Sequence, residues 1–194
     1  RDIDERQRRE VVLDERDVRG QPRHALVHVL EWLEVRQVDH REEGLLERSI
    51  IYATDINPIS LERARKGVFP LERMRAYTAS YQAAGGRAAF SDYYTAAYDG
   101  ALFDRSLSDN VIFADHSLAT DSVFAEMHLV SCRNVLIYFE RELQDRALGL
   151  FRDALCHRGF LGLGSKESLR FSEHSEAFED FVLEDRIYRK KAGL

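Results

Sequence analysis

Cysteine and long apolar runs are scarce in this sequence, and each absence removes a class of protein. The two cysteines, Cys132 and Cys156, lack the CxxC or Cys/His spacing of a zinc site and are too few for a disulfide scaffold. No apolar run approaches the roughly 20 residues that span a bilayer. The charged start RDIDERQRRE does not match a signal peptide. We therefore expect a cytoplasmic protein that does not insert into a membrane.

The charge balance and the histidines exclude further partners. A formal net charge of -6 creates no positive field to gather phosphate backbones, so nucleic acid is not expected. His24 and His28 have the spacing of helical metal ligands, but no third ligand completes a site, so no metal is expected. The length of 194 residues, with 44% hydrophobic and 32% charged side chains, fits one globular domain and predicts no particular oligomeric state.

The clearest local pattern is a buried strand followed by a capped helix. SIIYATDINP is a short β-branched run that ends in polar residues, which predicts a strand and a turn. Asn57 can cap the next helix, with Pro58 at its first position and Gly67 as its stop. Asp55, where the strand ends, can accept hydrogen bonds from ribose hydroxyls or can cap this helix, and the pattern leaves both open.

The second half of the chain continues the alternation. MHLVSCRNVLIYF predicts a strand that breaks at residues 131–134, and ERELQDRALGLFRDALCHRG predicts an amphipathic helix that ends at Gly159. GFLGLGS then predicts a strand, KESLRF a helical segment and FVLEDRIYRKK an edge strand, while residues 90–113 predict short strands or a hairpin. This order predicts right-handed crossovers and a mainly parallel sheet in an α/β fold.

The first 40 residues differ from the rest. Residues 1–21 are dense in both charge signs and can form a solvated helix or a disordered segment. The stretch HALVHVLEWLEV can be a short amphipathic helix or a strand, and its spacing does not decide between them.

Polar residues follow three of the predicted strands. Ligands of open α/β sheets bind at the carboxyl ends of the strands, so the groups to inspect are Asp55, residues 132–134 and residues 164–167. Cys132 has no evident paired base, which favours a packed thiol over a nucleophile.

Five blocks of the sequence together resemble a known family. In order, they are ATDINPISLERARKGVFPLERM, VIFADHSL, LVSCRNVLIYFERELQDRALGLF, GFLGLGSKESLRFS and IYRK. Their order and spacing are similar to the catalytic domain of CheR chemotaxis receptor methyltransferases. The resemblance covers roughly residues 41–192. It implies a Rossmann-like S-adenosylmethionine-dependent methyltransferase sheet in residues 41–194, with a small inserted β-subdomain at about 90–113, after a divergent segment 1–40.

The resemblance also implies functional residues. Asp55 would hold the ribose of S-adenosylmethionine, and the CRNV motif would border its methionine and adenine portions. The implied cofactor-binding residues are Asp55, Ile56, Ser117, Leu118, Asn134 and Val135. Ser117 stands where the family usually has asparagine, and serine is shorter. Tyr138 would lie near the transferred methyl group, and Arg133 joins it as a candidate catalytic residue.

One family motif has no counterpart here. Members carry a glycine-rich turn of the form AGCxTGEE after the first strand, upstream of a segment like EEGLLERSIIYATDI. This chain has RHALVHVLEWLEVRQVDHRE in that place, with no glycine between Gly20 and Gly44. Side chains at such turn positions would block close approach of the backbone to the cofactor. The GxGxxG turn of an oxidoreductase is absent as well.

The implied function is methylation of glutamate side chains on the cytoplasmic domain of chemotaxis receptors, with S-adenosylmethionine as cofactor. A glutamate carboxylate, with a pKa of about 4.3, is already an anionic nucleophile at neutral pH, so no general base is required. Tyr138 would position the reactants, or would simply pack on the sheet. The alternative function is a catalytically impaired remnant of the family that at most binds a receptor or another partner.

Overall fold

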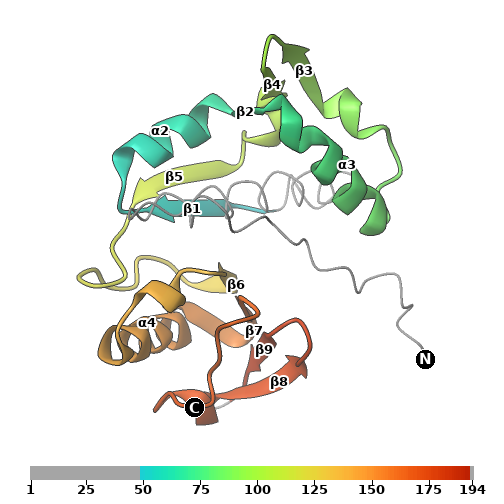
Figure 1. The fold of residues 1–194 in the computed structure, drawn as a ribbon. Helices are drawn as coiled ribbons and strands as arrows, with labels where there is room; N and C mark the ends of the chain where they lie inside the picture. The colour runs from blue at the N-terminus through green and yellow to red at the C-terminus, as the bar shows by residue number, and fades with distance from the viewer. Residues whose placement is uncertain (1–48, 193–194) are drawn as a thin grey trace. The chain divides into compact units, whose positions relative to one another are not determined.

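The computed structural model describes residues 49–192, which fall into two compact units that divide between Asp115 and His116. Figure 1 shows the order of helices and strands along the chain. Strands and helices alternate in both units, which confirms the predicted α/β class. The segments 1–40 and HALVHVLEWLEV lie outside the described residues.

The first unit contains the predicted strand, turn and helix. Strand β1, Ile51–Asp55, pairs in parallel with β5, Val111–Asp115, and helix α2, Pro58–Lys66, packs against the pair (Figure 1). The Asn57 side chain accepts a hydrogen bond from the Ile59 N–H at 3.0 Å. Gly67 ends the helix at a left-handed φ of 60°. The structure confirms this local prediction, whose sequence signals all act over a few residues.

The same unit holds a small antiparallel sheet in the order β2-β4-β3. Its strands are β2, Val68–Pro70, β3, Tyr94–Ala97, and β4, Gly100–Phe103, with helix α3, Met74–Ala83, alongside. Two strands therefore lie within the stretch 90–113, as predicted, and β2 joins them from an earlier segment.

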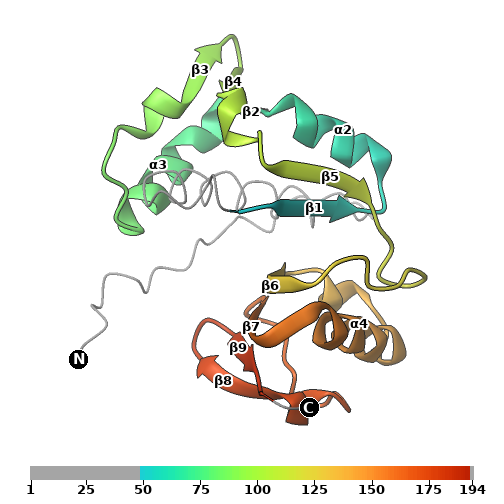
Figure 2. The same cartoon turned by 180° about the vertical axis from the view of Figure 1, so that it is seen from behind.

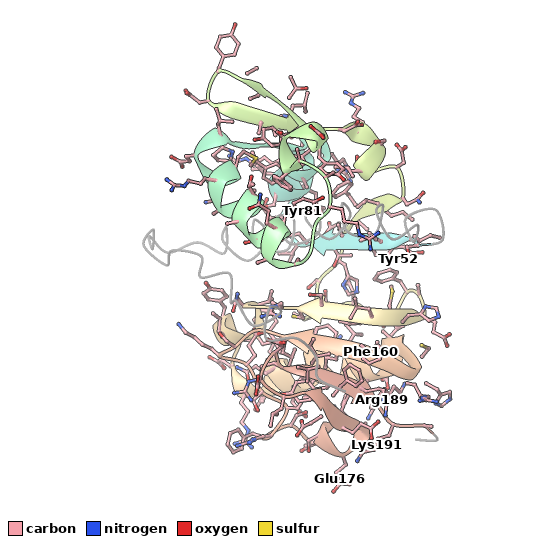
Figure 3. The ribbon with its side chains drawn as sticks, turned by 90° about the vertical axis from the view of Figure 1, so that its right-hand side faces the viewer. Tyr52, Tyr81, Phe160, Glu176, Arg189 and Lys191 are labelled. Atoms are coloured by element: carbon pink, nitrogen blue, oxygen red, sulfur yellow. The ribbon has the colours of Figure 1, made fainter. Side chains whose placement is uncertain are left out.

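Tyr81 of α3 lies at the centre of the aromatic core of this sheet, and Figure 3 labels it there. Its side chain is 0% exposed, and its ring lies 5.3 Å from that of Phe90. The Tyr81 hydroxyl accepts a hydrogen bond from the Ala88 N–H at 3.0 Å, so the buried phenol oxygen is satisfied.

The second unit is a four-stranded mixed sheet in the order β6-β7-β9-β8. Strand β6, Met127–Cys132, runs parallel to β7, Leu155–Leu163, whereas β9, Ile187–Lys190, and β8, Phe178–Val182, are antiparallel. Helix α4, Arg141–Ala154, packs beside β7 (Figure 2). Its buried face and the sheet form the core, with residues including Leu148, Phe151, Leu161 and Leu163.

Side chains bridge the antiparallel strands of this sheet. Phe160 of β7 and Arg189 of β9 lie side by side in Figure 3, in agreement with the strand register. The Phe160 ring lies 4.9 Å from that of Phe181, and the Arg189 guanidinium stacks over Phe181 at 5.7 Å. Arg189 also donates to Glu179 at 2.7 Å. These contacts fix the register of β8 and β9 on β7.

The structure corrects two predictions about the end of α4 and the sheet. The helix ends at Ala154 rather than at Gly159, which lies inside β7. A Cβ on Gly159 would stand 3.0 Å from the Cys156 carbonyl oxygen and 3.2 Å from that of His128, so glycine allows close approach both within β7 and to β6. The expected mainly parallel sheet is mixed among the described residues, and the segment FVLEDRIYRKK contributes both β8 and β9, of which β8 is at the edge.

The prediction that KESLRF forms a helical segment is wrong. Residues 164–172 form turns and irregular backbone. The side chain of Glu167 is engaged with backbone groups 31 to 33 residues earlier in the chain. These tertiary contacts override the local helical preference.

Candidate functional site

Asp55 is the polar group where β1 ends. Its half-buried side chain accepts a hydrogen bond from the Asn57 N–H at 2.5 Å. Asn57 itself caps α2, so the capping alternative for Asp55 is wrong. A carboxylate can accept about four hydrogen bonds. Within residues 49–192, Asp55 therefore keeps acceptor capacity for a ligand.

Two carboxyl groups lie next to each other where β1 and β5 end, and the charge of one affects the pKa of the other. Asp55 lies opposite Asp115, which ends the parallel strand β5. Burial raises the pKa of Asp55, the hydrogen bond from Asn57 partly offsets this, and the charge of Asp115 raises it further. Ile56, the next predicted ligand, is 63% exposed. A carboxylate beside an exposed apolar side chain suits a ribose next to an aromatic base.

A left-handed turn follows strand β6 in the second unit. Asn134 has a φ of 58°, and Val135 follows with φ -110° and ψ -47°. Alternation of left-handed and right-handed residues turns successive N–H groups to one side, and such a concave set of donors binds anions. A short 3-10 helix, Leu136–Tyr138, begins directly after it.

The anion in this turn is the side chain of Glu167. Oε1 accepts from the N–H groups of Val135 at 2.9 Å and Leu136 at 2.7 Å. Oε2 accepts from the N–H groups of Asn134 at 3.0 Å and Gly164 at 2.6 Å. Glu167 is only 4% exposed. All four partners are donors, which suits an ionised carboxylate, since a protonated one would need an acceptor for its O–H.

Gly164 leaves the space that this arrangement needs. A Cβ at this position would stand 2.5 Å from Asn134 Oδ1, 2.7 Å from Asn134 N and 2.8 Å from Glu167 Oε2. The end of β7 and the turn after β6 can therefore approach this closely only with glycine at position 164.

The four predicted residues of this turn have different surroundings. Arg133, Asn134 and Val135 are half-buried, and Val135 packs against the core of the second unit. Tyr138 is 61% exposed and borders an open hollow that Arg146 also lines. Their side chains make no hydrogen bond with any described residue, and the polar ones among them are available to a ligand.

Ser117 and Leu118 begin the loop that leads to β6. The Ser117 N–H donates to Asp121 Oδ2 at 2.8 Å, and this bond, together with the Thr120 hydroxyl, lowers the pKa of Asp121. Leu118 packs against the same core as Val135. The second unit therefore holds six of the eight predicted site residues, and the first unit holds Asp55 and Ile56.

Cys132 is a buried thiol at the end of β6. Burial, with a smaller contribution from the charge of Glu167, raises the pKa of this thiol far above its usual range. A protonated, inaccessible sulfur is a poor nucleophile, in line with the packed role expected of it.

Sequence reasoning noted Glu167 as a polar residue after a strand but gave it no role. Its partners lie 31 to 33 residues away, so no local pattern reveals the contact. Among residues 49–192, no three His, Cys, Asp or Glu side chains cluster in a way that could hold a metal ion. No helix in this part of the chain has the length and apolar character to cross a membrane.

The alternating strands and helices define a Rossmann-like α/β protein with polar groups where its strands end. The particular family is the CheR methyltransferase SAM-binding domain, whose profile matches residues 35–186, and the chain belongs to it. The α/β sheets are those of an S-adenosylmethionine-dependent methyltransferase, and S-adenosylmethionine is the methyl donor of this family.

Individual relatives have related names. A protein of Pseudomonas putida with the provisional name methyltransferase Cher3 is 67% identical over 150 residues, which cover 77% of this chain and 55% of that protein. A chemotaxis protein methyltransferase of Vibrio parahaemolyticus is 32% identical over 70% of this chain and 47% of its own length. One of Salmonella typhimurium is 29% identical over 69% of this chain and 43% of its own length. The chain therefore spans about half the length of these relatives.

Proposed function

We propose that this chain transfers methyl groups from S-adenosylmethionine to glutamate side chains on the cytoplasmic domains of chemotaxis receptors, in the cytoplasm. The observation that carries the proposal is that one family match, residues 35–186, includes both Asp55 and the turn at Asn134. The names of the relatives support a role in chemotaxis.

The residues present fit this cofactor. The donor-rich turn after β6 is already filled by the Glu167 carboxylate, so it has no N–H groups left for a phosphate. S-adenosylmethionine carries none. Asp55 keeps acceptor capacity for two ribose hydroxyls, and the Asn134 amide has both a donor and an acceptor to offer.

The proposed roles of the residues follow from the family resemblance. Bound S-adenosylmethionine supplies an electrophilic methyl group. Asp55 and Ile56 would hold the ribose side, Ser117 and Leu118 the adenine side, and the turn at Asn134 and Val135 the rest of the cofactor. Tyr138 and Arg133 would orient the receptor carboxylate, which needs no base because it is already ionised. Alignment of the carboxylate with the methyl group and exclusion of water would then accelerate the transfer.

The domain division is part of the proposal. Residues 41–194 would form the methyltransferase domain after the divergent segment 1–40. The small β-subdomain at about residues 90–113, which contains β3 and β4, would contact receptors.

A methyl-transfer assay tests the activity. The full chain is incubated with methyl-labelled S-adenosylmethionine and the purified cytoplasmic fragment of a chemotaxis receptor. Glutamyl methyl esters release volatile labelled methanol on treatment with base, so base-labile label on the receptor is the expected result. Receptor fragments with the accepting glutamates changed to alanine should remain unlabelled.

Binding separates the two functional alternatives. Calorimetric titration should show micromolar affinity for S-adenosylmethionine. Absence of binding by a chain with a cooperative thermal transition would contradict the enzyme and favour the impaired remnant.

The Tyr138→Phe variant tests the positioning role of Tyr138. It should keep the affinity for S-adenosylmethionine while kcat falls about tenfold, because only the aligned reaction uses the hydroxyl. The measurement is steady-state kinetics with the receptor fragment, with cofactor affinity from calorimetry. An unchanged kcat would support the packing role instead.

A further inference from the structure

We propose that Glu167 is a positioning residue of the cofactor site, which holds the backbone of residues 134–136 so that the Asn134 side chain faces the ligand. This inference rests on the proposed function for its ligand. Its structural half, that Glu167 holds the turn, can be tested without any ligand.

The geometry of the four hydrogen bonds carries the first step. The two carboxylate oxygens divide the donors in pairs, with Val135 and Leu136 on Oε1 and Asn134 and Gly164 on Oε2. One side chain therefore joins the turn after β6 to the end of β7. Because hydrogen bonds to a charged group are stronger than neutral ones, this junction fixes both segments.

The conformation of Asn134 carries the second step. Its φ of 58° is a left-handed conformation, which is uncommon for non-glycine residues although asparagine adopts it more readily than most. Three successive N–H bonds to Glu167 offset the cost of that conformation. The Asn134 Oδ1 atom lies 2.5 Å from where a Cβ on Gly164 would be, so the absent side chain at Gly164 leaves room for the amide. Glu167 holds the backbone of this residue, and the amide makes no hydrogen bond within residues 49–192.

The burial of Glu167 excludes a direct contact with the ligand. The side chain is 4% exposed, and its oxygens are occupied by backbone donors. Glu167 would therefore affect the cofactor only through the turn that it holds. Substitution of the Glu167 carboxylate should weaken cofactor binding without changing the affinity for the receptor.

Two variants of Glu167 and one control test this role. In Glu167→Gln, an NH2 group replaces one carboxylate oxygen and faces two N–H donors, so one pair of hydrogen bonds is lost. Glu167→Asp keeps the charge but is one methylene shorter. The control, Leu155→Ala, removes a buried side chain at the opposite end of β7, where Leu155 pairs with Met127. It should lower stability without touching the turn.

The first measurement is hydrogen–deuterium exchange of the full chain without ligand. Glu167→Gln should raise exchange at residues 134–136 and 164 at least tenfold relative to the wild type, with α4 unchanged. Leu155→Ala should raise exchange in β7 without this local effect. Unchanged exchange of the turn in Glu167→Gln would overturn the inference, whether or not the chain binds cofactor.

The second measurement is calorimetric titration with S-adenosylmethionine at a temperature where all variants are folded. We expect Kd to rise at least tenfold for Glu167→Gln, to rise less for Glu167→Asp, and to stay within twofold for Leu155→Ala. A loosened turn with unchanged Kd would overturn the positioning role and leave the proposed function intact. A wild type that binds no S-adenosylmethionine would overturn the proposed function and the positioning role, while the exchange result still decides whether Glu167 holds the turn.

Discussion

Asp55 and Glu167 are carboxylates at or just after the ends of strands in the two units, and they differ in how many hydrogen bonds they accept from the chain itself. Asp55 is half-buried and accepts one backbone N–H, from a residue two positions away. Glu167 is buried and accepts four, three of them from residues more than 30 positions away. The first keeps unused acceptor sites, whereas the acceptor sites of the second are filled by backbone N–H groups.

This difference shows why a polar residue after a strand is not by itself a binding residue. A carboxylate whose acceptor sites are filled by N–H groups contributes order, because its loss leaves several buried donors unpaired. A carboxylate with unused acceptors contributes affinity, because a ligand can complete its shell. Variants of the two regions should therefore separate stability from binding.

The Gly164→Ala substitution should have the largest effect, on stability. The added Cβ would stand 2.7 Å from Asn134 N and 2.8 Å from Glu167 Oε2, so backbone must shift. We expect a loss on the order of 3 kcal/mol in the free energy of unfolding, measured by urea denaturation. In Gly162→Ala, the nearest atom to the new Cβ is the Val130 carbonyl oxygen at 4.0 Å, so this control should stay within about 1 kcal/mol of the wild type. Equal losses of stability in the two variants would show that the junction with Glu167 does not require glycine at position 164.

The Asp55→Asn substitution should reduce binding and leave stability nearly unchanged. It replaces one acceptor oxygen of a charged group by a donor, which should weaken affinity for S-adenosylmethionine about tenfold or more. Calorimetry measures this loss. Asp109→Asn makes the same chemical change at an exposed residue of the same unit and should bind like the wild type. If Asp55→Asn bound the cofactor normally, Asp55 would not be its ribose acceptor.

The sequence predicted those features whose causes are local. Asn57, Pro58 and Gly67 predicted the bounds of α2 because capping acts over a few residues. Gly159 was misread as a helix stop, whereas it lies inside β7, close to the carbonyl oxygens of Cys156 and of His128, the second of which is on another strand. Asp55 was found as a candidate because it is the polar residue at the end of an apolar strand. The role of Glu167 was missed because its hydrogen bonds join segments that only the fold brings together.

The Asp115→Asn substitution should have the smallest effect, on the pH dependence of binding. Burial is the main cause of the raised pKa of Asp55, and the Asp115 charge is a lesser one, so its removal should lower that pKa only partly. The folded chain takes up the Asp55 proton more readily than the unfolded chain, so this group reduces stability as pH rises through the interval between the two pKa values. Affinity for the cofactor should instead rise with pH over this interval, because the ionised carboxylate is the form that accepts hydrogen bonds from hydroxyl groups.

Affinity for S-adenosylmethionine should therefore fall as pH decreases through the pKa of Asp55, and this fall should lie at lower pH in Asp115→Asn than in the wild type. Calorimetric titrations from pH 8 to pH 4 measure both curves, which should agree at pH 8, where Asp55 is ionised in either protein. The Asp55→Asn variant should lack this fall altogether. A fall that Asp55→Asn retains would arise from another group, and the open carboxylate of the first unit would then not be the one that the ligand completes.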